Sequence, residues 1–424
     1  MGQNVVLFFS NLMYSNQPYE AIMPKEKIAQ TSRLVNLPLE LLMHIFSYIL
    51  ESSVGAKNEK EKWPTKIKEV GTLAQTCRRF YQILEPQLNL QAKQLLLHVL
   101  QGDAANAEKM FTINPELLFI EATAPEYAAG IDEAGNAVHR IVRASPYRAA
   151  LGAGDKDLLT KMEVHFDKVG NFGTTHNPQG KTGWEMAKVQ FYEQFPNGIV
   201  DYPESAYYAK FNALAAAITE DLVLRQTQDY IPAIVKNPSE TTKALLVQLR
   251  NDFLPKEAVT SGHHFNLNHL LKAFEVYNAH WDEWNWNQRS LFWCQVIGYV
   301  ERLVPAVDAQ AFCMGLYYLL EQKQPLARGF KLENWGVNGA DFYFPASGGA
   351  GGLGFDFGIY IALARGHGAV ELRLRPVDCG AMRFIEQLCR AKTSGLDSFK
   401  QHLEQPAHRQ EQRQGRTARQ CVIL

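Results

Sequence analysis

Apolar residues at helical spacing recur along most of this chain and restrict it to a mainly α-helical fold. The stretch LVNLPLELLMHIFSYIL at 34–50 places six apolar side chains on one helix face, namely Leu37, Leu41, Leu42, Ile45, Phe46 and Ile49. Comparable spacing is found at 70–84 and in several stretches between 205 and 304. Residues 326–376 differ, because glycine-rich turns alternate there with short β-like runs. We expect a loop and a small β-hairpin in that region.

Composition narrows the classes of function. The chain has 424 residues, a formal net charge of −1 and 46% hydrophobic residues, which suits roughly two to four domains with apolar cores. Mixed charges near neutrality argue against a dedicated nucleic-acid-binding protein. No stretch approaches the roughly 20 apolar residues of a membrane span. Six cysteines without a Cys-x-x-Cys pair indicate a reducing cytosol rather than a zinc site or a disulfide framework.

Spacing alone indicates that residues 34–84 form two amphipathic helices of an ordinary bundle. The sequence LPLELLMHIFSYIL … LAQTCRRFYQIL resembles the F-box. That family is known for Leu-Pro-x-Glu-Leu at its start, an Ile-Phe-Ser-Tyr helix and Cys-Arg-Arg-Phe at its end. The likeness covers about 33–85. It departs between Leu50 and Cys77, where the link is longer than is usual in that family.

The F-box resemblance implies docking on a Skp-family adaptor of cullin–RING ubiquitin ligases. So small a helical unit buries its own apolar surface poorly and completes its core against a partner. The residues that the resemblance assigns to adaptor binding are Leu37, Pro38, Leu41, Leu42, Ile45, Phe46, Leu73, Cys77 and Phe80.

A second pattern recurs between 89 and 195: a helix, a glycine-containing turn and another helix. Gly102-Asp103 and Gly154-Asp155 mark two copies, and NPQGKTGWEMAKVQF at 177–191 opens a third. The pattern resembles ankyrin repeats, which implies stacked helical units with a concave protein-binding face. The two glycines lie 52 residues apart, beyond the usual period of about 33, and we assign the excess to a loop at 120–136. Chance similarity among helix-rich segments is the open alternative.

Three other groups of residues are expected to be structural. Gly180-Lys181-Thr182 lacks the earlier glycine and the leading strand of a phosphate-binding loop, and is expected as the turn of the third repeat. Four tryptophans are expected in an aromatic core: Trp281, Trp284, Trp286 and Trp293. Neighbouring polar residues lack metal-binding spacing and are expected as surface or capping residues: His263, His264, His269, His280, Asp282 and Glu283. We predict no catalytic, cofactor or metal site.

The carboxyl end carries a prenylation signal. Cys421 is followed by two aliphatic residues and a final leucine, the pattern that directs geranylgeranyl transfer to the cysteine. The preceding residues lack a core-forming pattern and carry four cations, Arg409, Arg413, Arg416 and Arg419. Because one lipid binds membranes only reversibly, we expect these arginines to act as a second signal toward anionic leaflets.

The combination of these parts resembles the F-box/ankyrin effectors that Legionella-type bacteria inject into host cells. The resemblance implies a chain secreted into a host, acting in its cytosol and on the cytosolic face of its membranes, with a Skp-family adaptor, a cullin, a host geranylgeranyltransferase and a host target protein as partners. The expected domains are an N-terminal segment (1–31), the F-box (32–88), ankyrin-like repeats (89–195), a helix-rich C-terminal domain (196–400) and a basic tail (401–424).

The leading functional prediction is a non-catalytic substrate receptor of a ubiquitin ligase, held on a membrane by its lipid. Two alternatives stay open. One is an enzyme of unknown chemistry in the C-terminal half, localised by the other parts. The other is a membrane-tethered interaction protein with no role in a ligase.

Overall fold

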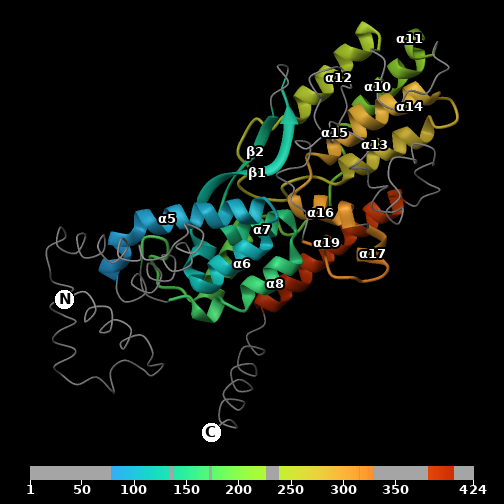
Figure 1. Cartoon of the computed structure of the whole chain (residues 1–424). Coiled ribbons are helices and arrows are strands. Elements are labelled where there is room, and N and C mark those ends of the chain that lie inside the picture. Colours follow the sequence, from blue (N-terminus) through green and yellow to red (C-terminus); the bar gives the residue numbers. More distant parts are fainter. Residues whose placement is uncertain are drawn as a thin grey trace, which may run out of the picture.

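Two separate apolar cores organise the part of the chain that the structure describes. The computed structural model describes residues 78–132, 137–170, 174–225, 238–314, 316–328 and 381–404. Each core is surrounded by its own set of helices, and the resulting two lobes lie side by side (Figure 1). The mainly α-helical fold is as predicted from the helical spacing.

The first lobe contains the amino-terminal helices. Its elements are α5 (Arg78–Leu100), α6 (Ala104–Ile113), the 3₁₀ turn η2 (Pro115–Phe119), α7 (Pro146–Ala153), α8 (Lys156–Glu163), the 3₁₀ turn η3 (Phe166–Lys168) and α9 (Gly183–Gln194). Two of the helix connections are the Gly-Asp turns that the sequence predicts. Gly102 and Gly154 have φ of +72° and +64°, a conformation that glycine adopts without steric cost.

The aspartate after each of these glycines starts the next helix. Asp103 accepts a hydrogen bond from the backbone of Asn106 (3.2 Å), and Asp155 accepts one from the backbone of Leu158 (3.1 Å). Each carboxylate thereby satisfies a free N–H group at a helix N-terminus. These turns are confirmed, whereas the assignment of the lobe to ankyrin repeats stays a prediction.

An antiparallel hairpin lies where we expected a loop. Strand β1 (Ala122–Ile131) pairs with β2 (Ala137–Ala144), with an irregularity between Pro125 and Ala129. Residues 120–136 were therefore wrongly predicted. Burial alternates along β2, but one of its inward positions holds Arg140 rather than an apolar residue. The sequence therefore lacks the regular alternation of apolar and polar residues that identifies a strand. The hairpin predicted within 326–376 lies almost wholly outside the described residues.

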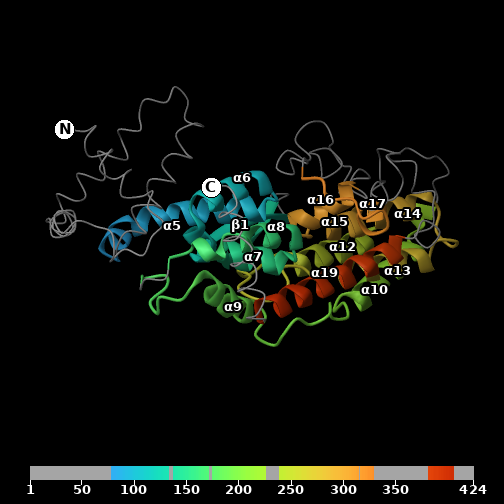
Figure 2. The same ribbon diagram turned by 90° about the horizontal axis from the view of Figure 1, so that it is seen from below.

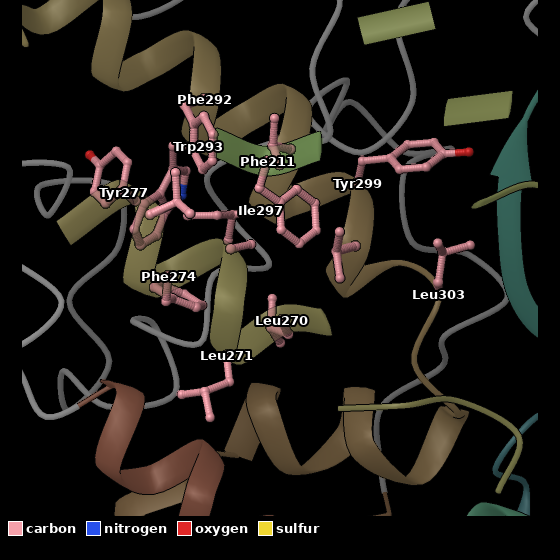
Figure 3. Packing of buried hydrophobic residues seen from close by; sticks show 14 of the residues in the cluster. Phe211, Leu270, Leu271, Phe274, Tyr277, Phe292, Trp293, Ile297, Tyr299 and Leu303 are labelled. Carbon is pink, nitrogen blue, oxygen red and sulfur yellow. The ribbon is translucent and has the colours of Figure 1, made fainter. Parts of the chain in front are cut away.

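The second lobe is a helical bundle around an aromatic core. Its elements are α10 (Tyr208–Glu220), α11 (Leu222–Arg225), α12 (Glu240–Phe253), α13 (Asn268–Ala279), α14 (Trp286–Phe292), the π-helical turn η4 (Trp293–Ile297), α15 (Gly298–Glu301), α16 (Ala306–Met314) and α17 (Leu316–Leu320). Figure 3 shows Phe274, Tyr277 and Trp293 packed together in this core.

The tryptophan prediction holds for the residues whose side chains are described. Trp284 and Trp293 are buried, and the indole N–H of Trp284 donates to Thr219 Oγ1 (2.7 Å). Trp281 lies at the edge of the core, where the Arg289 guanidinium stands 4.0 Å from its ring centroid. The side chain of Trp286 lies outside the described part.

One long helix joins the two cores. The apolar face of α19 (Ala381–Glu404) contributes to the second core with Phe384, Ile385 and Leu388. Farther along, it contributes to the first core with Leu396, Phe399 and Leu403. Leu388 and Leu396 lie eight residues apart, about two helical turns, with the buried Lys392 midway between them, so a single helix face stabilises both lobes.

Candidate functional site

The predicted adaptor-binding residues lie almost entirely before the described part of the chain. Of the nine, Phe80 alone falls within α5, where only the backbone is described. Eight lie outside the described residues, namely Leu37, Pro38, Leu41, Leu42, Ile45, Phe46, Leu73 and Cys77. The lipidation and basic residues also lie outside it, namely Cys421, Arg409, Arg413, Arg416 and Arg419. These assignments stay predictions.

Helix α5 leads from the F-box-like stretch into the first core. Leu84 is 3% exposed and Leu88 is fully buried, and both pack with Ala92, Leu95 and Leu96. Pro86 lies within the helix on its exposed side, where water can satisfy the carbonyl that loses its usual partner. The end of the F-box-like stretch is thus part of the hydrophobic core of the first lobe.

The boundary between the lobes holds a buried ionic cluster centred on Glu126 of β1. Its carboxylate accepts hydrogen bonds from Arg140 (2.8 Å) and from Nδ1 of His264 (3.0 Å). The guanidinium of Arg140 also donates to the carbonyl of Leu303, in the second lobe. Burial alone would raise the pKa of Glu126, but Arg140 and His264 hold that pKa below its ordinary value.

A second buried ion pair connects α19 to α16. The ammonium of Lys392 contacts the carboxylate of Asp308, and their side chains are 7% and 3% exposed. Burial raises the pKa of Asp308, and the charge of Lys392 offsets this in part. Nearby, Arg328 forms a bidentate pair with Asp155, the residue that caps α8. Together with the Glu126 cluster, these groups form an ionic seam between the lobes.

The two Gly-Asp turns lie against this seam. Gln310 of α16 donates to the carbonyl of Gly102 (3.0 Å). A Cβ added at Gly102 would stand 2.9 Å from Gln310 Nε2, and one at Gly154 would stand 2.5 Å from Cε of Lys392. The turns that link the helices of the first lobe are therefore covered by side chains of the second lobe and of α19.

The histidines are more buried than predicted. His264 was expected at the surface or at a cap, but its side chain is fully buried in the ionic seam. Burial lowers the pKa of His263, beside Lys392, and the pKa of His269 to about 4 each. His280 does end a helix, α13. Among the described residues, no group of three or more His, Cys, Asp or Glu side chains is arranged to hold a metal ion.

Lys181 occupies a turn rather than a phosphate-binding loop. Its backbone N–H donates to the Asn177 side chain (2.8 Å), whose amide group in turn donates to the Lys181 carbonyl (2.7 Å). Thr182 then caps α9 in a reciprocal pair with Glu185. The interpretation of this stretch as a turn is confirmed.

Two further features of the described residues are a free thiol and an open surface depression. Cys389 is a free thiol, and burial raises its pKa to about 12, so the thiol stays protonated and unreactive near neutral pH. An open depression of about 500 Å³ lies along α12, lined by Glu240, Lys243, Ala244, Val247, Gln248, Asn251 and Asp252. Within the described helices, none is both long and apolar enough to span a bilayer.

Two protein families match parts of the chain. Residues 34–88 match the F-box-like family, and residues 267–403 match the CBUA0006 C-terminal domain. The chain therefore contains an F-box-like domain and a CBUA0006 C-terminal domain. Neither a curated protein nor a solved structure gives a significant match.

The extents of these matches relate directly to the fold. The F-box-like domain ends at Leu88, ten residues into α5, and so shares that helix with the first lobe. The CBUA0006 C-terminal domain begins just before α13 and includes nearly all of α19. The second half of α19 packs into the first core, so this domain contributes to both lobes.

Sequence reasoning named Asp155 only as part of a turn and missed five other residues of the ionic seam, namely Glu126, Arg140, Asp308, Arg328 and Lys392. One residue of the seam could have been recognised from the sequence. Lys392 lies between Leu388 and Leu396, four residues from each, on the apolar face of a helix, and a cation at such a position indicates a buried partner.

Proposed function

We propose that this protein is a substrate receptor of a cullin–RING ubiquitin ligase, delivered by a bacterium into a host cell and anchored there to a membrane. The F-box-like domain would bind a Skp-family adaptor and, through it, the cullin. The lobes would hold a host target protein. A geranylgeranyl group on Cys421, added by the host transferase, would place the assembly at the cytosolic face of a membrane.

The observation that carries this proposal is the F-box-like domain and its connection to the lobes. F-box domains are non-catalytic docking modules, and this one leads directly into a folded body through α5. Leu84 and Leu88 are buried in the first core, so the docking module and the body share one helix. That connection suits a receptor, which has to hold its target at a defined position relative to the ligase.

The lobes constrain where a target can bind. The turns at Gly102 and Gly154 are covered by Gln310 and Lys392, so they are not available to another protein. A target would therefore use other surfaces of the lobes. The high pKa of the Cys389 thiol and the structural role of Lys181 give no support to an enzymatic function.

Affinity purification of the full chain from human cells, followed by mass spectrometry, tests the proposal. A receptor brings down the adaptor and the cullin together with a target protein. If membranes and membrane proteins are recovered without adaptor or cullin, the protein is instead a tethered interaction protein outside any ligase.

A further inference from the structure

The end of α19 is surrounded by residues of α8 and α9. Figure 2 shows α19 passing beside α9. The Tyr192 hydroxyl donates to the carboxylate of Glu404, the last residue of the helix, and Nζ of Lys400 lies 5.8 Å from the centroid of the Tyr192 ring. Nδ1 of His402 lies 2.8 Å from Oε1 of Glu163, at the end of α8.

Large hydrophobic side chains are exposed around this end of α19. Val189 and Tyr192 of α9 are 36% and 41% exposed. Val189 and Tyr192 are three residues apart and share the outer face of α9 with Lys188. The face therefore combines the aliphatic Val189, the ring of Tyr192 with its hydroxyl bonded to the Glu404 carboxylate, and two lysines, Lys188 and Lys400.

The position of Cys421 relates this face to a membrane. Cys421 is 17 residues beyond Glu404, and a stretch of that length reaches at most about 60 Å even when fully extended. Of the described elements, α19 is the one joined directly to the tail. A lipid on Cys421 would hold its end close to the bilayer, and tethering raises the local concentration of a weak contact.

We propose that the residues Lys188, Val189, Tyr192 and Lys400, which we call the α9–α19 face, contact the bilayer surface when the tail is anchored. This inference rests on the membrane anchoring in the proposed function. Tyrosine suits the membrane–water interface because its ring is apolar and its hydroxyl is polar. The lysines place their stems against apolar surface while their ammonium groups reach the headgroups. The face thereby supplements a lipid that alone binds reversibly.

The second lobe provides a matched control. Leu222 and Val247 of α11 and α12 are 65% and 43% exposed, and their helices lie at the opposite end of the molecule from the end of α19 (Figure 1). They are more exposed than Val189 and Tyr192, but no tail is attached near them.

The first experiment measures partition of the geranylgeranylated full chain into phosphatidylcholine vesicles. Val189→Asp with Tyr192→Asp should reduce partition by about tenfold, while Leu222→Asp with Val247→Asp should leave it unchanged. Far-ultraviolet circular dichroism and thermal melting confirm folding, and Val189→Ser alone serves if the double variant unfolds. Equal partition of both double variants, or equal loss in both, would overturn the proposal.

The second experiment does not depend on prenylation. The full chain with a carboxyl-terminal hexahistidine extension is bound to vesicles that contain a nickel-chelating lipid, and amide hydrogen exchange is followed. Exchange across 184–194 should slow several-fold on the vesicles, while exchange across 240–253 should not change. Unchanged exchange in α9 would show that the α9–α19 face does not contact the bilayer. If exchange in α9 slows on the vesicles but cells do not prenylate the protein, the contact of the face with the bilayer is supported. The lipid anchor is then removed from the proposed function.

Discussion

Lys392 of α19 and Asp308 of α16 form a buried ion pair at the junction of two hydrophobic cores. The two residues are 84 positions apart in the chain. The Lys392 side chain also packs against Gly154, in the turn that leads to α8. Because α19 packs into both cores on either side of Lys392, this pair fixes the helix where it crosses from one lobe to the other.

Removing one partner of this pair should destabilise the protein strongly. Lys392→Met leaves the Asp308 carboxylate buried without its cation, which typically costs about 3–5 kcal/mol in the free energy of unfolding. The double variant Lys392→Met with Asp308→Leu removes both charges and should recover most of the loss. Urea denaturation measures both. A single variant as stable as the parent would show that the pair is not buried in solution.

Gly152 of α7 should not tolerate a side chain. A Cβ at this position would stand 2.3 Å from Nε2 of His264 and 2.8 Å from Nε2 of Gln194. Gly152→Ala should therefore cost about 1–3 kcal/mol. Gly395→Ala in α19 is the control, because its Cβ would meet only the flexible Lys156 side chain at 3.2 Å, and the change should stabilise the helix by up to about 1 kcal/mol. Thermal or urea denaturation of both variants compares them directly, and a neutral Gly152→Ala would contradict the close approach of His264.

Acidification should weaken the fold between about pH 6.5 and pH 4. Burial lowers the pKa of His263 and of His269 to about 4, whereas an unfolded histidine titrates near 6.5. The unfolded chain therefore takes up protons in this interval while the folded protein does not. The free energy of unfolding should fall by up to about 1.4 kcal/mol per pH unit for each histidine.

The variant His269→Asn isolates one of these contributions. Urea denaturation at several pH values should give a shallower dependence of stability on pH, smaller than that of the parent by about one proton between pH 4 and pH 6.5. A dependence as steep as in the parent would mean that His269 is not the buried, neutral group that the fold requires.

The sequence reveals features that depend on neighbours along the chain, and it conceals those that depend on distant partners. The Gly-Asp turns, the cap at Thr182 and the apolar face of α19 involve residues a few positions apart, and each could be read from the sequence. The hairpin could not, because Glu126 and Arg140 are buried by pairing with each other, with His264 and with the carbonyl of Leu303.

The candidate site likewise has a part that depends on neighbouring residues and a part that depends on residues far apart in the sequence. The F-box-like stretch is a local sequence pattern, and the sequence alone located it to within a few residues of the family match at 34–88. The ionic seam joins residues from β1, β2, α16 and α19 with His264, Arg328 and the turn residue Asp155. Of these residues, only Lys392 indicated the seam in the sequence, because it is a cation on an apolar helix face.

The lipid anchor should depend on one thiol. Cys421→Ser should release the protein from host membranes, because no other group in the signal accepts the lipid. Leu424→Ser should redirect the chain toward farnesyl, since the last residue selects the transferase. Neutralising Arg409, Arg413, Arg416 and Arg419 should only weaken attachment, by about 1 kcal/mol per charge. Fractionation of cells that express each variant measures the three effects. If Cys421→Ser stays on membranes as fully as the parent, the tail is not the anchor.

The most direct test of the account is adaptor binding by the variant Leu37→Ala with Pro38→Ala. The change removes an apolar anchor and a preset helix start, and truncations of interface anchors commonly cost about 2 kcal/mol or more. We expect that the Skp-family adaptor no longer co-purifies with the variant, while the variant stays soluble and keeps the melting behaviour of the parent. Undiminished recovery of the adaptor with this variant would contradict the account.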